Sequence, residues 1–171
     1  MKRPQRKLGA FFFEEGGLLR LITLSDYFFD SYAGCTEILQ KRSRPYACLE
    51  VLIDGIPFAV PFRHHISHGW AYITYDRCGL DYTKAIVLAD KRFVGSEDVS
   101  IEQREFDALK GKEHRIVSGM RKYLAVYKKS VQYADNPRYD RIRLCSTLQY
   151  FHAELSMIDQ PCEVDAEQSI K

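Results

Sequence analysis

The sequence lacks any long hydrophobic run. No stretch of its 171 residues approaches the roughly 20 consecutive apolar residues that a membrane span needs. The apolar segment at residues 8–13 is short and rich in phenylalanine. Glu14 and Glu15 follow it, where a signal peptide would have the small residues of a cleavage site. We therefore expect a cytoplasmic protein with no membrane partner.

Cysteine is scarce and scattered. The five cysteines (Cys35, Cys48, Cys78, Cys145 and Cys162) form no CxxC pair, which argues against a zinc ribbon. Cys48 lies in an apolar stretch typical of a core residue, and nothing around Cys48 or Cys78 is typical of an activated nucleophile. We expect neither a cofactor nor a bound metal.

What remains is the composition of one globular domain, with 46% apolar and 28% charged residues. We expect a peripheral or disordered arm at residues 1–17, a folded domain at 18–156 and a disordered acidic tail at 157–171. Residues 110–143 carry ten basic and three acidic side chains, whereas residues 154–171 carry one basic and five acidic. This asymmetry indicates a polyanionic partner on one face, with a solvated helix surface as the ordinary alternative.

The pattern of apolar residues and turn signals predicts an α+β fold. We expect strands over residues 18–24, 46–53, 58–60, 70–75 and 84–88, and helices over 25–39, 100–110 and 113–133 and after Ser146. Asp54-Gly55 predicts a tight hairpin turn, and residues 76–79 predict another turn. Short strands joined this closely predict a compact, twisted, mostly antiparallel sheet or small β-barrel, decorated by helices. In the helix expected after Ser146, Leu148, Phe151 and Leu155 are predicted core residues. His152 beside them has the pattern of a core histidine whose hydrogen bonds are satisfied.

The most informative stretch is residues 61–68, which hold three of the five histidines and Arg63. Histidine exchanges protons near neutral pH, and arginine binds phosphate oxygens through its planar fork. Such a group could act as a metal-independent ribonuclease site, as a metal site, or as an ordinary polar loop. A metal site is disfavoured because three near-neighbours in one loop fit tetrahedral geometry poorly and the nearest carboxylates expected are Asp54 and Asp76. The hairpin should also bring Arg44 to the same end as Arg63.

Several uncommon strings occur together in a fixed order. They are RPY at 44–46, IDGIPFAVPFRHHISH at 53–68, GLDYTKA at 79–85, EFDALKGKE at 105–113 and STLQYFH at 146–152. In this order they resemble the TenpN toxins of type III toxin–antitoxin systems, a group related to ToxN, CptN and AbiQ. The resemblance covers roughly residues 20–156.

The resemblance implies a barrel similar to the MazF and Kid toxins and a sequence-biased endoribonuclease that needs no metal. Such enzymes leave a 2′,3′-cyclic phosphate and a 5′-hydroxyl. They are inhibited by a small folded, pseudoknot-like RNA antitoxin, which they process from a repeat array and bind in closed hetero-oligomers. Many of these systems abort phage infection, with cellular or phage RNA as the substrate.

The family motif of Arg, a small polar residue and then His-Ile-x-His matches Arg63, His65 and His68, whereas His64 stands at the small polar place. We assign His65 as the general base, His68 as the acid and Arg63 as the cation that stabilises the phosphate; the two histidine roles can be exchanged. The basic residue before the first core strand is Arg44 or Lys41.

Further RNA contacts are expected from Lys84, Arg121, Lys122, Lys128 and Lys129. Tyr123, Tyr127 and Tyr133 could stack on bases, although tyrosines at that spacing are more often core residues. The competing function classes are a non-catalytic RNA- or DNA-binding regulator and a metal-dependent hydrolase using His64, His65 and His68.

Overall fold

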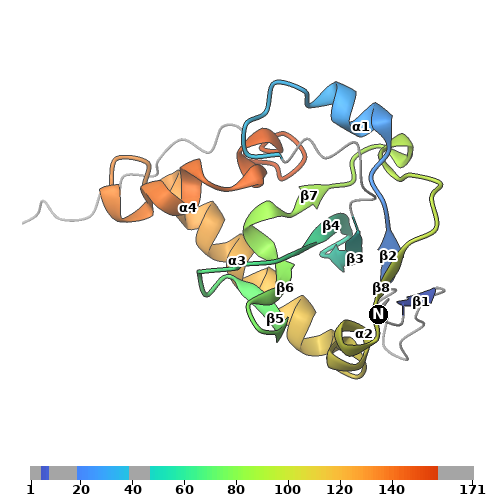
Figure 1. The fold of residues 1–171 in the computed structure, drawn as a ribbon. Helices are drawn as coiled ribbons and strands as arrows, with labels where there is room; N and C mark the ends of the chain where they lie inside the picture. Colours follow the sequence, from blue (N-terminus) through green and yellow to red (C-terminus); the bar gives the residue numbers. More distant parts are fainter. Residues whose placement is uncertain (1–4, 8–18, 39–46, 158–171) are drawn as a thin grey trace, which may run out of the picture.

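The computed structural model describes residues 5–7, 19–38 and 47–157, which form a mixed α+β fold (Figure 1). The strands are β1 (Gln5–Lys7), β2 (Arg20–Ile22), β3 (Cys48–Ile53), β4 (Ile56–Arg63), β5 (Ala71–Tyr75), β6 (Cys78–Asp81), β7 (Ile86–Val87) and β8 (Ser100–Glu102). The α-helices are α1 (Asp26–Ser31), α2 (Gln103–Leu109), α3 (Glu113–Gln132) and α4 (Asp140–Leu144). The 3₁₀ helices are η1 (Tyr82–Lys84), η2 (Lys91–Phe93), η3 (Pro137–Tyr139) and η4 (Thr147–Tyr150). None of these described helices is long and apolar enough to cross a membrane.

Strand β4 is the centre of the main sheet. It pairs with the whole of β3, from Cys48 opposite Pro61 to Ile53 opposite Ile56. Its other edge is shared, because β7 pairs with the first half of β4 and β6 pairs with Phe62 and Arg63 at its end. The predicted hairpin turn is confirmed: Asp54 and Gly55 both have positive φ, at 50° and 82°, as a two-residue primed turn requires.

The main sheet is antiparallel and open among the described strands, with the order β2-β3-β4-β6-β5 and β7 added beside β4. Its edge strands are β2 and β5, and no pairing joins them in the described part of the chain. The expected closed barrel is therefore not confirmed. Closing a sheet needs tilted strands that pair at both edges, and β2 is only three residues long. A separate two-stranded sheet joins β1 to β8.

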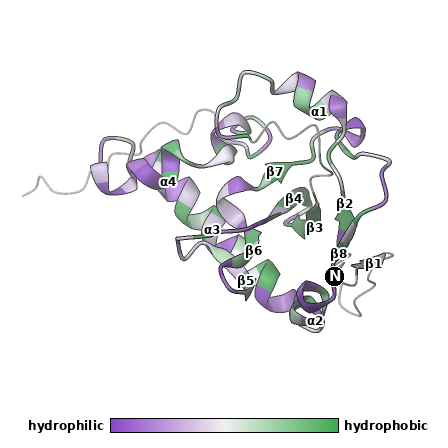
Figure 2. Cartoon of the chain, in the orientation of Figure 1, coloured by the Kyte–Doolittle hydropathy of each residue, from purple (hydrophilic) through white to green (hydrophobic). Residues whose placement is uncertain are grey.

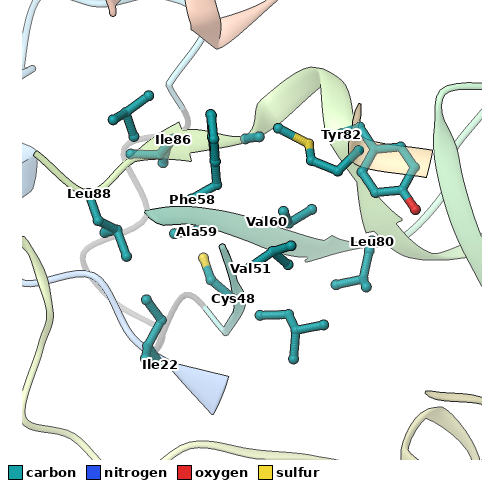
Figure 3. Close-up of a cluster of buried hydrophobic side chains, with 14 of the residues drawn as sticks. Ile22, Cys48, Val51, Phe58, Ala59, Val60, Leu80, Tyr82, Ile86 and Leu88 are labelled. Atoms are coloured by element: carbon teal, nitrogen blue, oxygen red, sulfur yellow. The ribbon is translucent and has the colours of Figure 1, made fainter. Parts of the chain in front are cut away.

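The core reaches both faces of β4, because its successive residues Phe58, Ala59 and Val60 are all buried. Side chains from β2, β3, β4, β6, η1 and β7 meet in one buried cluster (Figure 3). Phe58 and Leu80 have no exposed surface. Fully burying a side chain of this size stabilises the folded state by roughly 1.5–3 kcal/mol, so the cluster fixes where β4 and β6 end.

Helix α3 covers this core and carries the basic surface. Apolar residues recur along it at three- and four-residue steps, which predicts a core stripe of Ile116, Met120, Leu124, Tyr127 and Val131. The first four are buried and Val131 is half-buried. Figure 1 shows α3 running from α2 to α4 past the β5–β6 hairpin, and Figure 2 shows hydrophobic and hydrophilic patches alternating along it. At Gly119 an added Cβ would lie 2.5 Å from the Tyr82 hydroxyl, so this glycine lets η1 pack directly against the helix.

Strand β6 was missed by the sequence prediction, which placed a turn at residues 76–79. The turn consists of Asp76 and Arg77 alone, with φ values of 40° and 69°, and β6 starts at the next residue. Glycine and aspartate are poor strand formers, which hid the strand. Gly79 is nevertheless required, because a Cβ there would lie 2.0 Å from the carbonyl oxygen of Tyr72.

The strand predicted at residues 84–88 is also wrong in its bounds. Residues 82–84 form η1, because the Asp81 side chain accepts a hydrogen bond from the Thr83 amide at 3.0 Å and so caps a helical turn. Only Ile86 and Val87 remain as a strand. Asp81, rather than Lys84, therefore stands at the end of a strand beside β4.

Three predicted helices differ from the observed ones. Helix α1 is capped by Ser25 as expected but ends at Ser31, well before residue 39, because Tyr32 leaves the helical region. The helix expected from residue 100 begins at Gln103 with a capping box formed by Glu102 and Glu105, because Ser100 belongs to β8. Ser146 caps the 3₁₀ helix η4 rather than an α-helix, since its hydroxyl accepts from the Leu148 amide at 3.2 Å.

Some expectations concern residues beyond the described ranges. Of the arm expected at residues 1–17 the structure describes β1 alone, and Lys41, Arg44 and residues 158–171 lie outside the described residues. The core expected near the end of the domain is confirmed: Leu148, Phe151 and Leu155 are buried. His152 is half-buried beside them and its Nε2 lies 2.8 Å from the Tyr127 hydroxyl.

Burial lowers the pKa of His152 below its ordinary value of 6.5. The unfolded chain therefore binds a proton on this ring at a higher pH than the folded chain does, and stability falls as pH falls through and below about 6.5. We predict that wild-type protein loses more unfolding free energy between about pH 7.5 and pH 5.5 than His152→Gln does. Urea denaturation at both pH values checks this, and an equal loss in the two proteins would contradict it.

Candidate active site

The histidine-rich stretch begins where β4 ends. Arg63 is the last residue of β4 and pairs with Gly79 of β6, so residues 64–68 leave the sheet beside β6. Ile66 is buried, and its amide donates to the Arg77 carbonyl at 2.9 Å. The Arg77 side chain returns to the carbonyl oxygens of Ile66 and His65 at 3.2 and 3.3 Å. These contacts hold the loop in one shape while its polar side chains stay near solvent.

The buried carboxylate of Asp81 organises the site. Its side chain is only 1% exposed, and the Arg63 guanidinium donates to it from Nη1 at 3.0 Å. Thr83 donates to the other oxygen through its amide at 3.0 Å and its hydroxyl at 2.6 Å. A buried carboxylate is tolerated only when paired and hydrogen-bonded, and both conditions hold here.

His68 is held by the same carboxylate. Its Nε2 lies 3.4 Å from Asp81 Oδ1, and its Nδ1 accepts a hydrogen bond from the Trp70 amide at 3.2 Å. Because an amide can only donate, the neutral ring carries its proton on Nε2, facing Asp81. The ring is therefore fixed in orientation and tautomer, with a quarter of its side chain exposed.

His64 and His65 are exposed and lie next to this pair. His65 has a φ of 60°, a left-handed conformation that is uncommon outside glycine, asparagine and aspartate. None of the other described residues hydrogen-bonds the His65 ring, and the residue is exposed. The ring of His64 has its Nδ1 2.9 Å from the buried sulfur of Cys78.

Behind His64 lies a cluster of partly buried groups on β5 and α2. Burial raises the pKa of Tyr75 to about 12, and its hydroxyl is 3.4 Å from Glu102. Burial also raises the pKa of the Glu105 carboxyl, while the charge of His64 opposes that rise. Cys48, in contrast, is wholly buried and burial raises the pKa of its thiol, so it is a core residue.

The sequence prediction overlooked Asp81. The nearest carboxylates were expected to be Asp54 and Asp76, but Asp54 lies at the opposite end of β4, 3.3 Å from Arg121, and Asp76 is exposed in a turn. Asp81 was hidden by the misplaced strand at 84–88. The Asp-x-Thr spacing at residues 81–83 could have revealed Asp81, because an aspartate in this pattern caps the next turn with its side chain.

The three histidines do not converge on one point. His68 faces Asp81, His64 faces Cys78 and His65 is exposed. No group of three or more His, Cys, Asp or Glu side chains in the described ranges is arranged to hold a metal ion. Among the described side chains, Arg63 and His68 instead converge on the carboxylate of Asp81.

The residues expected to contact RNA fall into separate groups. Lys84 is largely buried, where it pairs with Glu37 and donates to the Cys145 carbonyl at 2.8 Å, so its charge is already neutralised. Lys122, Lys128 and Lys129 are exposed on α3, as is Arg121. The hydroxyls of the buried Tyr123 and Tyr127 bond Ser146 and His152, whereas Tyr133 is 54% exposed.

Comparison with known proteins gives no relative: no family model, no curated protein and no solved structure matches this chain.

We predict that Asp81→Asn lowers the free energy of unfolding by about 3 kcal/mol, because it leaves the Arg63 charge without its partner. Asp76→Asn makes the same chemical change in an exposed turn, where asparagine also accepts positive φ, and should stay within about 0.5 kcal/mol of wild type. Urea denaturation compares the two variants. Equal stabilities would show that Asp81 does not organise this end of the sheet.

Proposed function

We propose that this chain is a metal-independent endoribonuclease toxin of a type III toxin–antitoxin system, active in the cytoplasm. The observation that supports this best is the arrangement at the end of β4, where Arg63 and His68 share the buried carboxylate of Asp81 beside the exposed His65. A cation and proton-transfer groups are what RNA cleavage without a metal requires. The assignment to a type III toxin–antitoxin system rests on the TenpN-like strings of the sequence.

The reaction is a transesterification within the RNA. His65 takes the proton of a 2′-hydroxyl, and the 2′-oxygen attacks the adjacent phosphorus. The bond from phosphorus to the 5′-oxygen breaks, and that oxygen receives a proton. The products are a 2′,3′-cyclic phosphate and a 5′-hydroxyl.

Arg63 stabilises the charge that builds on the phosphate oxygens. Asp81 engages only Nη1 of its guanidinium, and arginine has five N–H donors in all, so donors remain for phosphate. Its side chain is 30% exposed, which leaves it accessible from the histidine side. Asp81 acts here as a positioning residue.

The proton donor is one of two histidines. Asp81 holds the ring of His68 in orientation, in the way a carboxylate orients a catalytic imidazole. His64 is more exposed and its Nε2 is not used by Cys78. The pH dependence of cleavage by His64→Asn and His68→Asn separates them, because loss of the donor removes the basic limb of the profile.

The regulatory half of the proposal is an RNA antitoxin. A small folded RNA, cut by the toxin from a repeat array, would bind the protein directly and block cleavage in a closed hetero-oligomer, with phage infection as the condition that releases it. The exposed lysines of α3 support an RNA partner of this kind. They equally support a non-catalytic RNA-binding regulator, which is the second candidate function.

The first experiment is to extract the nucleic acid that copurifies with the protein and to determine its size, sequence and 3′-end chemistry. One short repeat-derived RNA ending in a 2′,3′-cyclic phosphate supports both halves of the proposal. Heterogeneous RNA with ordinary ends favours the regulator.

We predict that His65→Asn lowers the rate of RNA cleavage by about 10²–10⁴-fold, the usual contribution of one general base. Asparagine is the right replacement because it accepts the positive φ of this position, so the loop keeps its shape. Binding of the inhibitory RNA should stay within about tenfold, since only one side chain of the interface changes.

His114→Asn is the matched control, since His114 is exposed on α3 and is not part of the loop at residues 64–68. It should cleave at the wild-type rate, and wild-type cleavage should persist in excess EDTA. Normal cleavage by His65→Asn would remove His65 from the mechanism.

A further inference from the structure

An exposed aromatic pair lies where α3 ends. Tyr133 is the C-terminal cap of α3 and Tyr139 ends η3. Their rings are stacked, with centroids 6.3 Å apart and an angle of 30° between the planes. Tyr133 is 54% exposed and Tyr139 is half-buried, so the pair presents a flat apolar face to solvent.

The turn between the two tyrosines is held by its own hydrogen bonds. The Asn136 amide donates to the Tyr133 carbonyl at 3.0 Å, and the Tyr139 amide donates to the Asn136 carbonyl at 3.0 Å. The Asn136 side chain accepts from the Arg138 amide at 3.0 Å, and Pro137 occupies the first turn of η3. These hydrogen bonds hold the turn that carries both rings, so binding of a ligand costs little conformational entropy.

Cations surround this pair. Lys129 Nζ lies 5.9 Å from the centre of the Tyr133 ring, and Lys128, Arg138 and Arg141 are exposed nearby in sequence. Those three make no ion pair with other described residues. Arg143, by contrast, is engaged by Asp140 at 2.7 Å.

Stacked aromatic rings among unpaired cations are the surface that single-stranded nucleic acid binds, since bases stack on the rings and phosphates meet the cations. A second exposed tyrosine, Tyr27, has different charged neighbours. Tyr27 also has an arginine over its ring, Arg92 at 4.2 Å, but Arg92 is paired with Asp90, and Asp26 and Asp30 lie beside Tyr27 on α1. The cation over Tyr27 is therefore already paired with a carboxylate, which makes it a weaker contact for a phosphate.

The pair is also distant from the candidate active site. Tyr82, next to Asp81, packs against α3 at Gly119. Tyr133 lies fourteen residues further along, which is about 20 Å at 1.5 Å per residue. A ligand on Tyr133 therefore need not touch the reacting phosphate.

We propose that Tyr133 and Tyr139, with Lys129, Arg138 and Arg141, bind unpaired bases of the partner RNA rather than the bond that is cleaved. This inference rests on the proposed function for the identity of the RNA. The surface itself is argued from its own contacts and stands without that function.

The test uses a fluorescent single-stranded RNA of about 12 nucleotides, within the usual site sizes for such surfaces. Its 2′-oxygens are methylated, so it has no 2′-hydroxyl to react and cannot be cleaved. Binding to the full-length protein is measured by fluorescence anisotropy, with a duplex of the same sequence for comparison.

We predict that the single strand binds more tightly than the duplex and that Tyr133→Ala weakens single-strand binding by about tenfold. Tyr133→Phe keeps the ring and should stay within about twofold of wild type, while Tyr27→Ala, the matched control, should have no effect. Arg138→Gln should lower the slope of log affinity against log salt by about 0.7, whereas Tyr133→Ala should leave that slope unchanged.

Unchanged binding by Tyr133→Ala, or an equal loss in Tyr27→Ala, would overturn the proposal. At saturating unmodified RNA the maximal cleavage rate of Tyr133→Ala should equal that of wild type, because the surface does not contact the reacting phosphate; a tenfold lower maximal rate would assign the surface to the cleavage site and overturn the assignment to a partner RNA. If wild-type protein cleaves no RNA but the Tyr133 effects hold, the endoribonuclease proposal fails and the binding surface remains.

Discussion

The carboxylate of Asp81 is the charge on which this end of the molecule depends. It is removed from water, and the described groups that offset the cost of that removal are the Arg63 guanidinium, the two donors of Thr83 and the ring of His68. Satisfying it requires β4 and β6 to end side by side and η1 to turn immediately afterwards. The same requirement directs one face of Arg63 and the ring of His68 inward and leaves His64 and His65 outside. A single buried charge thus separates the positioning groups from the groups that can meet a ligand.

Helix α3 supports that charge from behind. The Tyr82 hydroxyl, one residue after Asp81, donates to the Ile116 carbonyl at 3.2 Å, and Gly119 provides the space for the Tyr82 ring. The ring of the buried Tyr123 lies 5.7 Å from that of Trp70, whose amide holds His68. The apolar face of α3 therefore fixes two supports of the site, while its polar face carries the exposed lysines. One helix links the candidate active site to the basic surface at its far end.

The sequence was a good guide wherever one local rule decided the structure. The Asp54-Gly55 turn, the length of α3 and its buried stripe followed from turn chemistry and helical periodicity, and the histidine-rich loop was placed correctly at the end of a strand. It was a poor guide where two local rules competed. Gly79 fell in the turn predicted at residues 76–79 and Asp81 fell in no predicted element, yet packing against Tyr72 and pairing with Arg63 make them part of β6. The tyrosines of α3 could equally have been core or surface until their burial was known.

The sequence by itself determined the α+β character, the hairpin, the long basic helix and the set of polar residues that gather near residue 63, because each depends on neighbours within a few positions. Only the tertiary structure decided that the described sheet is open, that Lys84 is neutralised, and that Asp81 joins Arg63 to His68. Those facts depend on groups far apart in the chain: Asp81 is eighteen residues from Arg63, and Lys84 is paired with Glu37, forty-seven residues away. Which distant charges share one desolvated space is set by the packing of the whole core, and no local pattern contains that information.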